Sequence, residues 1–222
     1  MLDTSSLSEK IETQLKREIM SGDLAPGQRL TIDDIAVRLQ VSAMPVRDAV
    51  RRLDGLGFLK VAPRRGVYVE VFDQTRFKET MEVRIALECL AVELAAPRIP
   101  TEMIGDARSQ YQRAGAYFAE TGDLSQLVEC DNLLHDLIIS HSENPLLINI
   151  MSQLRDLIEW AHHIVAKLQP KGKVDALPEH LAILDVLITR DVRRTQCALR
   201  EHLENTMRRT LSAWDQSLDQ AI

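Results

Sequence analysis

Four side chains that can bind a metal ion lie among apolar residues in the second half of the sequence. Asp131 and His135 are four positions apart, a spacing that places both on one face of a helix. His180 and His202 follow on two later apolar segments. One carboxylate and three imidazoles can surround a divalent ion, and this ligand mixture suits zinc, nickel or manganese. Alternatively, each histidine is a hydrogen-bonded residue of the core or its rim, and spacing alone leaves both interpretations open.

A single arginine, Arg84, lies on the apolar stripe of a helix predicted over residues 77–96. A charge in such a position needs a partner. The guanidinium could clamp the carboxylate of a bound ligand through two parallel hydrogen bonds. It could equally form an internal salt bridge with Glu88, one helical turn further on.

A second group of chemically active residues is basic and lies between residues 31 and 69. Apolar residues at helical spacing predict two short helices, the first capped by Thr31 and the second by Ser42. Two short β-type runs around Ala-Pro-Arg-Arg-Gly then predict a hairpin. The candidate nucleic-acid contacts in this stretch are Ser42, Arg47, Arg51, Arg52, Arg64, Arg65 and Gly66.

Two short helices with arginines on the open face of the second helix suit the major groove of DNA. Arg47 would read bases or anchor the nearest phosphate, and Arg51, Arg52 and Arg65 would contact phosphates. The basic hairpin tip suits the flanking backbone or minor groove, where Gly66 lets the main chain approach closely. The alternative is an ordinary helix pair with a solvated basic face.

The distribution of charge also favours DNA, although the net charge is −6. Residues 38–66 contain seven Lys/Arg and two Asp/Glu, whereas residues 71–222 contain 16 basic and 23 acidic residues. A basic module on an acidic body is typical of a DNA-binding domain attached to another domain. Three scattered cysteines and the absence of a long apolar run indicate a reducing, cytoplasmic location and no membrane partner.

The helical periodicity predicts a mostly α protein with two domains. Residues 1–72 form an N-terminal winged helix-turn-helix, in which a capping box at Ser6 begins a first helix. Residues 73–222 form an all-helical bundle of about six helices. Bundles of this kind commonly carry ligand or metal sites in their core, between facing helices. The predicted helices cover residues 77–96, 101–120, 123–141, 145–168, 177–190 and 192–218.

The first seventy residues resemble the GntR family of bacterial transcription regulators. The similarity covers residues 19–30, Val41-Ser42, residues 45–50 and residues 63–66. The sequence departs from the family pattern after Ser42, where Ala43 and Met44 replace an arginine and a small residue, and at Ile32-Asp33. These differences concern the operator sequence rather than the class of activity.

The helical part resembles the ligand-binding FCD domain of the FadR subfamily at residues 81–88, 131–135, 142–146, 179–180 and 201–203. The metal-binding branch of that domain uses an Asp-x3-His pair and two later histidines. The resemblance therefore implies Asp131, His135, His180 and His202 as ligands. It also implies open coordination positions that face a small acidic effector, commonly a carboxylate metabolite.

These features together predict a transcription regulator and not an enzyme. We expect a homodimer on a palindromic DNA operator, usually as a repressor, with effector binding at the metal site controlling operator affinity. Two alternatives use the same site: a direct sensor of the metal ion, and a metalloenzyme that activates water. The effector, the metal used in the cell, the operator and the regulated genes lie beyond the sequence.

Overall fold

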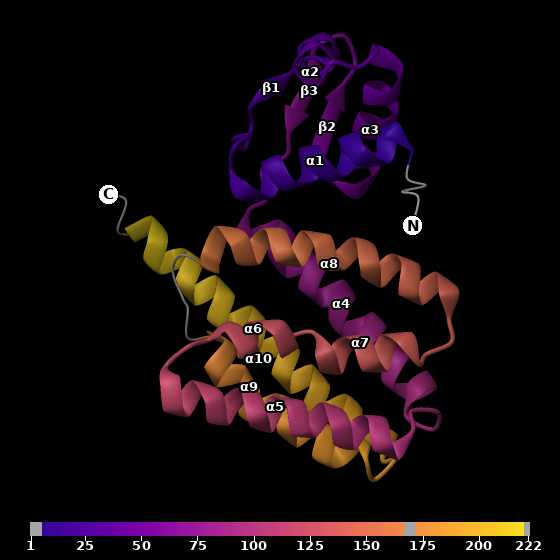
Figure 1. The fold of residues 1–222 in the computed structure, drawn as a ribbon, viewed down its shortest axis with the longest axis vertical. Coiled ribbons are helices and arrows are strands. Elements are labelled where there is room, and N and C mark those ends of the chain that lie inside the picture. The colour runs from indigo at the N-terminus through magenta and orange to yellow at the C-terminus, as the bar shows by residue number, and fades with distance from the viewer. Residues whose placement is uncertain (1–5, 167–171, 220–222) are drawn as a thin grey trace. The chain divides into compact units, whose positions relative to one another are not determined.

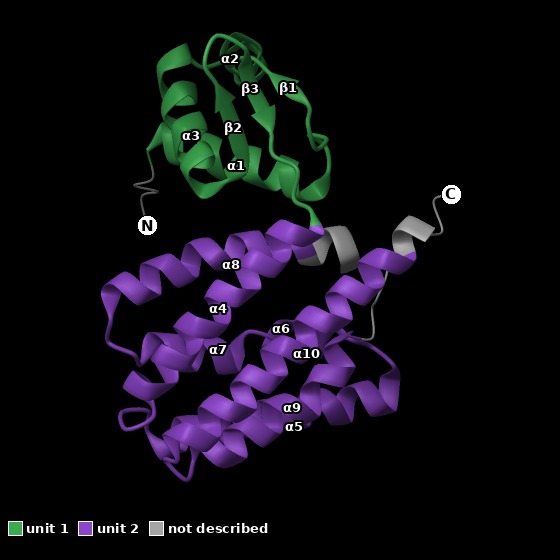
Figure 2. Cartoon of the chain, turned by 180° about the vertical axis from the view of Figure 1, so that it is seen from behind, with its two compact units in different colours: residues 1–73 green, residues 74–222 purple. Residues whose placement is uncertain are grey.

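The structure, a computed structural model, describes residues 6–166 and 172–219. The chain divides into two compact units, Met1–Asp73 and Gln74–Ile222, which Figure 2 shows in different colours. Each unit has its own buried core, and each is described separately below.

The first unit is a winged helix-turn-helix, as predicted. Its elements are α1 (Leu7–Ser21), β1 (Arg29–Leu30), α2 (Ile32–Leu39), α3 (Ala43–Leu56), β2 (Leu59–Ala62) and β3 (Gly66–Val69). The strands form an antiparallel sheet in the order β1-β3-β2, with Lys60 opposite Tyr68. Strand β1 has only two residues, which is too short to produce an alternating pattern in the sequence.

Capping residues begin the helices of this unit. The Ser6 side chain accepts a hydrogen bond from the Glu9 backbone and the Glu9 side chain accepts one from the Ser6 backbone, so the predicted capping box forms. Thr31 caps α2 by accepting from the backbone of Asp34. Ser42 is the N-cap residue of α3, but its side chain makes no capping hydrogen bond.

The core of the first unit lies between α1 and α3, which pack against each other. Leu15 of α1 and Val46, Ala49 and Leu53 of α3 are fully buried. Because the apolar positions of α3 recur at helical spacing, they occupy one face of the helix. The opposite face, which carries Arg47 and its neighbours, is therefore left exposed.

The second unit is all-helical among the described residues. It consists of α4 (Gln74–Ala95), α5 (Thr101–Thr121), α6 (Ser125–Cys130), α7 (Leu133–Ser140), α8 (Pro145–Ala166), α9 (Gly172–Leu187) and α10 (Val192–Asp219). Helix α4 packs against α7, α8 and α10, while α9 packs against α5 and α10 (Figure 1). These contacts bring α7, α9 and α10, which are far apart in sequence, around one interior.

The helix predicted over residues 123–141 is two helices, which makes seven described helices instead of about six. The break falls at Asp131 and Asn132, where the backbone of Asn132 has φ −90° and ψ −2°. The hydroxyl of Tyr111 lies at this break. It donates to the carbonyl of Asp131 (3.4 Å) and accepts from the backbone N–H of Leu134 (3.2 Å). A tyrosine from α5 thus supplies hydrogen bonds where the helix is interrupted.

Helix α9 begins at Gly172, earlier than the start near Leu177 that the sequence indicated. The early start places Pro178 inside the helix, where a proline usually marks a boundary. As a consequence, Lys173 lies on the same helix as His180. Seven residues separate them, which is two turns, so both side chains leave the helix on one side.

We predict that Tyr111→Phe destabilises the helical unit by about 1–2 kcal/mol, because the buried N–H of Leu134 loses its acceptor while the ring is kept. Tyr117→Phe is the matched control, since the Tyr117 hydroxyl bonds Asp123 at an exposed site (3.2 Å). Urea unfolding of both variants measures the difference. Equal free energies of unfolding for the two variants would contradict the role given to the Tyr111 hydroxyl.

Candidate functional site

Three buried histidines from three helices form a cluster in the second unit. His135 lies on α7, His180 on α9 and His202 on α10, and none has more than 4% of its surface exposed. One ring nitrogen from each lies within 4.8 Å of those of the other two. The ring centroids of His180 and His202 are 4.4 Å apart. The structure therefore brings together three of the four predicted metal ligands.

Two of these imidazoles are oriented by carboxylates. Nδ1 of His135 lies 2.6 Å from Glu88 Oε2, and Nδ1 of His202 lies 2.7 Å from Glu179 Oε2. Since a carboxylate oxygen accepts, Nδ1 carries a proton in each ring, and Nε2 is the nitrogen that is available to bind a metal ion. Carboxylates hold metal-binding histidines in this same way, which fixes the tautomer and strengthens the ligand.

The third histidine has a buried nitrogen without a hydrogen-bond partner among the described residues. That atom is Nε2 of His180, whose ring packs on Tyr111 at a centroid distance of 4.9 Å. Burial, and then the neighbouring His202 and His135, lower the pKa of His180 well below its ordinary value. The ring is therefore neutral, the form that binds metals. A buried polar atom without a partner costs free energy, and a metal ion is a partner that these three rings fit.

Glu88 links the cluster to Arg84. The Glu88 side chain is fully buried, and its Oε1 accepts from Arg84 Nε at 2.5 Å. Burial alone would raise the pKa of Glu88, but Arg84 and His135 beside it hold that pKa far below its usual range. The carboxylate is thus ionised between two cationic or donating groups. Of the two roles considered for Arg84, the structure contains the internal salt bridge.

Arg84 also borders a cavity of about 30 Å³ next to His135. Helix α8 contributes Arg155 to this cavity, and Arg155 is paired with Asp136. The lining residues are Arg84, Glu88, Asn132, His135, Ile139, Met151, Arg155, Ile158 and Glu159. A contact between Arg84 and a bound ligand stays a prediction.

Glu179 is a second supporting residue that the sequence did not identify. Besides His202, it binds Asn205 and both terminal nitrogens of Arg209, at 2.8–2.9 Å. Burial raises the pKa of Glu179, but these hydrogen bonds outweigh burial and lower it to about 2. Glu179 precedes His180 in the sequence but bonds His202, and no local spacing could have indicated that pair.

Asp131, the fourth predicted ligand, lies outside the group of mutually close ligand atoms. Its carboxylate accepts a hydrogen bond from the ammonium of Lys173 on α9. The break between α6 and α7 separates Asp131 from the helix that carries His135, so the expected continuous helical face does not exist. Its role as a ligand stays a prediction.

The candidate DNA contacts lie on α3 and the hairpin of the first unit. Arg47, Arg51, Arg64 and Arg65 are exposed, and in the described part of the chain none of them forms an ion pair. Arg52 differs, because its Nη1 lies 3.5 Å from both Glu9 and Glu12 of α1. Those carboxylates hold the Arg52 side chain over α1 and partly neutralise it.

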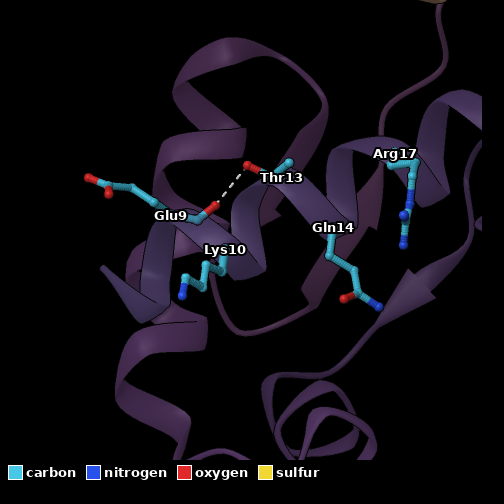
Figure 3. Close-up of a pocket in the computed structure, with 5 residues that line it drawn as sticks. All are labelled: Glu9, Lys10, Thr13, Gln14 and Arg17. Atoms are coloured by element: carbon cyan, nitrogen blue, oxygen red, sulfur yellow. Dashed lines mark hydrogen bonds between the residues drawn. The ribbon is translucent and has the colours of Figure 1, made fainter. Parts of the chain in front are cut away.

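The exposed side of α1 carries polar side chains of both signs around a surface hollow (Figure 3). Glu9 and Thr13 lie at one end, where the Thr13 hydroxyl donates to the Glu9 carbonyl at 2.9 Å. Arg17 lies at the other end. The mixed charge distinguishes this surface from the basic face of α3.

The hairpin tip depends on two left-handed backbone positions. The Arg65 N–H donates to the Ala62 carbonyl at 3.0 Å, which closes a turn with Pro63 and Arg64 as its central residues. Arg64 has φ +64° and Gly66 has φ +119°. A Cβ on Gly66 would also lie 3.0 Å from Arg29 Nε. Glycine is thus needed here for the hairpin itself, whether or not DNA approaches it.

A winged helix-turn-helix with an exposed basic helix, joined to a helical unit with a buried histidine cluster, is the architecture of a DNA-binding regulator with a second, helical domain. Comparison with known families agrees. The model for bacterial regulatory proteins of the gntR family matches residues 7–69, and the FCD domain model matches residues 79–205. The chain belongs to the GntR family of bacterial regulators that carry an FCD domain.

Individual relatives are similar over most of the chain. The transcriptional regulator McbR of Escherichia coli K12 is 27% identical over 206 residues, covering 81% of this chain and 93% of McbR. The repressor RspR of the same organism is 26% identical, covering 90% of this chain and 87% of RspR. A solved structure of E. coli McbR has the same fold, with a TM-score of 0.69, 24% identity and coverage of 96% and 100%.

The helical unit also resembles a zinc-bound domain. The Zn²⁺-bound FCD domain of TM0439 is 25% identical, with a TM-score of 0.54, covering 64% of this chain and 96% of that domain. The matched families and relatives are transcription regulators. They confirm the prediction of a regulator and argue against the alternative prediction of a metalloenzyme. Within the described residues, no helix is long and apolar enough to span a bilayer.

We predict that the helical unit loses stability as the pH falls from 7.5 to 5.5 in the presence of a chelator. Burial lowers the pKa of both His180 and His202 below 6.5, so in this range the unfolded chain binds protons that the folded chain does not. Stability then decreases with falling pH, by at most about 1.4 kcal/mol per pH unit for each histidine. Urea unfolding at several pH values measures the slope.

The variant His180→Gln should flatten this slope, because the residue cannot be protonated. His141→Gln removes an imidazole outside the cluster and should keep the slope of the native chain. Glu179 contributes little to this slope above pH 5.5, because the ordinary pKa of 4.5 that it has in the unfolded chain lies below this range. A slope that is the same in all three proteins would contradict the neutral state of His180.

Proposed function

We propose that this regulator controls its operator affinity through a small carboxylate effector bound at a divalent metal ion. His135, His180 and His202 would hold the ion, with Asp131 as a fourth ligand. The observation that carries the proposal is the buried Nε2 of His180, which has no hydrogen-bond partner among the described residues. It lies beside two imidazoles whose Nδ1 atoms are hydrogen-bonded to carboxylates.

Three imidazoles suit zinc, nickel or manganese, and the zinc-bound relative supports zinc among them. Such an ion would supply open coordination positions to an acidic ligand. Arg84 and Arg155 border the cavity beside His135, together with Glu88 and Glu159, and they are the groups that would bind an effector carboxylate. Each arginine has a carboxylate partner in this structure, and an effector carboxylate would share or replace that partner.

The DNA partner would be a palindromic operator bound by a homodimer. A two-fold dimer presents two copies of α3 to half-sites about one helical turn apart. Arg47 would read bases or the nearest phosphate, with Ser42 at the helix start. Arg51, Arg52, Arg64 and Arg65 would contact phosphates, and Gly66 would let the hairpin main chain approach the backbone. Such a protein acts where the DNA is, in the cytoplasm.

Control of operator binding would follow from linkage between the two domains. The effector must bind one arrangement of the dimer more tightly than the other, since only differential affinity shifts an equilibrium. Repression is the favoured direction, because the relative RspR is described as a repressor.

A direct metal sensor is the second candidate. The cluster is buried between α7, α9 and α10, so an ion alone could change how these helices pack. Operator binding by chelated and metal-loaded protein, each with and without a panel of small carboxylic acids, separates the two. Release by an acid only when metal is loaded supports the effector, and release by metal alone supports the sensor.

We predict that Arg47→Ala weakens operator binding by at least about tenfold and lowers the salt dependence by about one charge, since a phosphate or base contact is lost. Fluorescence anisotropy at several salt concentrations measures both. Arg193→Ala is the control, because Arg193 is exposed on the helical unit. Operator binding as tight as that of the native chain would remove Arg47 from the interface.

We predict that His180→Ala lowers the metal content of the purified protein while the helical fold persists. The substitution deletes the ligand whose Nε2 lacks a partner, and the other two rings cannot hold an ion as tightly alone. Metal analysis and circular dichroism measure the two effects. His141→Ala should retain full metal, and full occupancy in His180→Ala would show the ligand assignment to be wrong.

A further inference from the structure

Lys173 engages the one predicted ligand that lies apart from the histidines. We infer that Lys173 competes with the metal ion for Asp131 and thereby sets the metal affinity of the site. This inference rests on the metal site of the proposed function. It assigns a role to a residue that neither the sequence pattern nor the histidine cluster identified.

The first support is the position of Lys173. It lies on α9, two turns before His180 and on the same side of that helix. Its ammonium binds the Asp131 carboxylate, and the two side chains are 29% and 18% exposed. A cation supplied by the protein is therefore bound to the same carboxylate that would bind the metal.

The second support is the main chain around Asp131. The Tyr111 hydroxyl holds the Asp131 carbonyl and the Leu134 N–H across the helix break, and the Tyr111 ring packs on His180. The backbone of Asp131 is thus tied to the histidine cluster. In the inferred exchange, the Asp131 side chain would turn from Lys173 towards the histidines while its backbone keeps these contacts.

Two electrostatic effects follow from this arrangement. A carboxylate oxygen that accepts from an ammonium has to give up that partner before it can bind an ion, so the ion pair opposes metal binding. The pair is partly exposed, however, and such pairs are worth little, so Lys173 can move into water at a modest cost. Lys173 would therefore lower the metal affinity without preventing metal binding.

Lys173→Met tests the inference, because it keeps an unbranched side chain of nearly the same length and removes the charge. Titration of this variant with Zn²⁺ against a competing chelator should show up to about fivefold tighter binding than in the native chain, because a partly exposed ion pair is worth at most about 1 kcal/mol. Lys78→Met is the matched control, since Lys78 is an exposed lysine paired with Glu82 on α4. If the single variant Lys173→Met binds zinc no more tightly than the native chain, the inference is overturned.

A double-mutant cycle separates competition for Asp131 from simple repulsion between Lys173 and the ion. Asp131→Asn should weaken zinc binding, and Lys173→Met should then improve binding by less than about twofold. An equal gain from Lys173→Met in the native and the Asp131→Asn backgrounds would show plain repulsion and overturn the competition.

The same titrations distinguish failure of the inference from failure of the proposed function. Zinc binding by the native chain, without tighter binding by Lys173→Met, contradicts only the inference. Zinc binding by Lys173→Met but not by the native chain supports the competition, and it contradicts a regulator that depends on metal in its native form. Absence of zinc binding in the native chain and in every variant contradicts both.

Discussion

The helical unit depends on two carboxylate–imidazole pairs, the buried pair of Glu88 with His135 and the partly buried pair of Glu179 with His202. Each pair fixes Nδ1 as a donor and so turns the other ring nitrogen towards the cluster as the candidate metal ligand. Arg84 and Arg209 keep the carboxylates ionised in places where burial alone would favour protonation. The pairs also connect α4 to α7 and α9 to α10. The interactions that orient the candidate ligands are therefore among those that hold the bundle together.

Whether a feature of the fold or the site could be predicted depends on how far apart in the sequence the interacting residues lie. The Ser6 and Thr31 caps and the apolar faces of the helices come from residues a few positions apart, and the structure contains them. The approach of the three histidines was implied by family resemblance, since spacing alone left it open. Glu179 was not identified, because its bond to His202 joins two helices, and contacts of that kind leave no periodic trace in a sequence.

The differences from the sequence predictions have the same physical origin. The helix around Asp131 is interrupted at a point where Tyr111, from another helix, supplies the hydrogen bonds. The start of α9 was placed too late because proline normally ends a helix, whereas here the chain remains helical on both sides of Pro178. In both places tertiary contacts outweigh a local preference, which is where reading a single sequence is least secure.

Pro178 has a further consequence for the first turns of α9. Proline has no backbone N–H, so the carbonyl of Val174 cannot receive the hydrogen bond that residue four positions later normally donates. One rung of the helix is missing between the turn that carries Lys173 and the turn that carries His180. Amide protons before Pro178 should therefore exchange with solvent through local fraying, while those after it are protected by the full cooperativity of the bundle. The proline thus divides α9 into a first segment that opens locally and a second segment that opens only with the rest of the bundle.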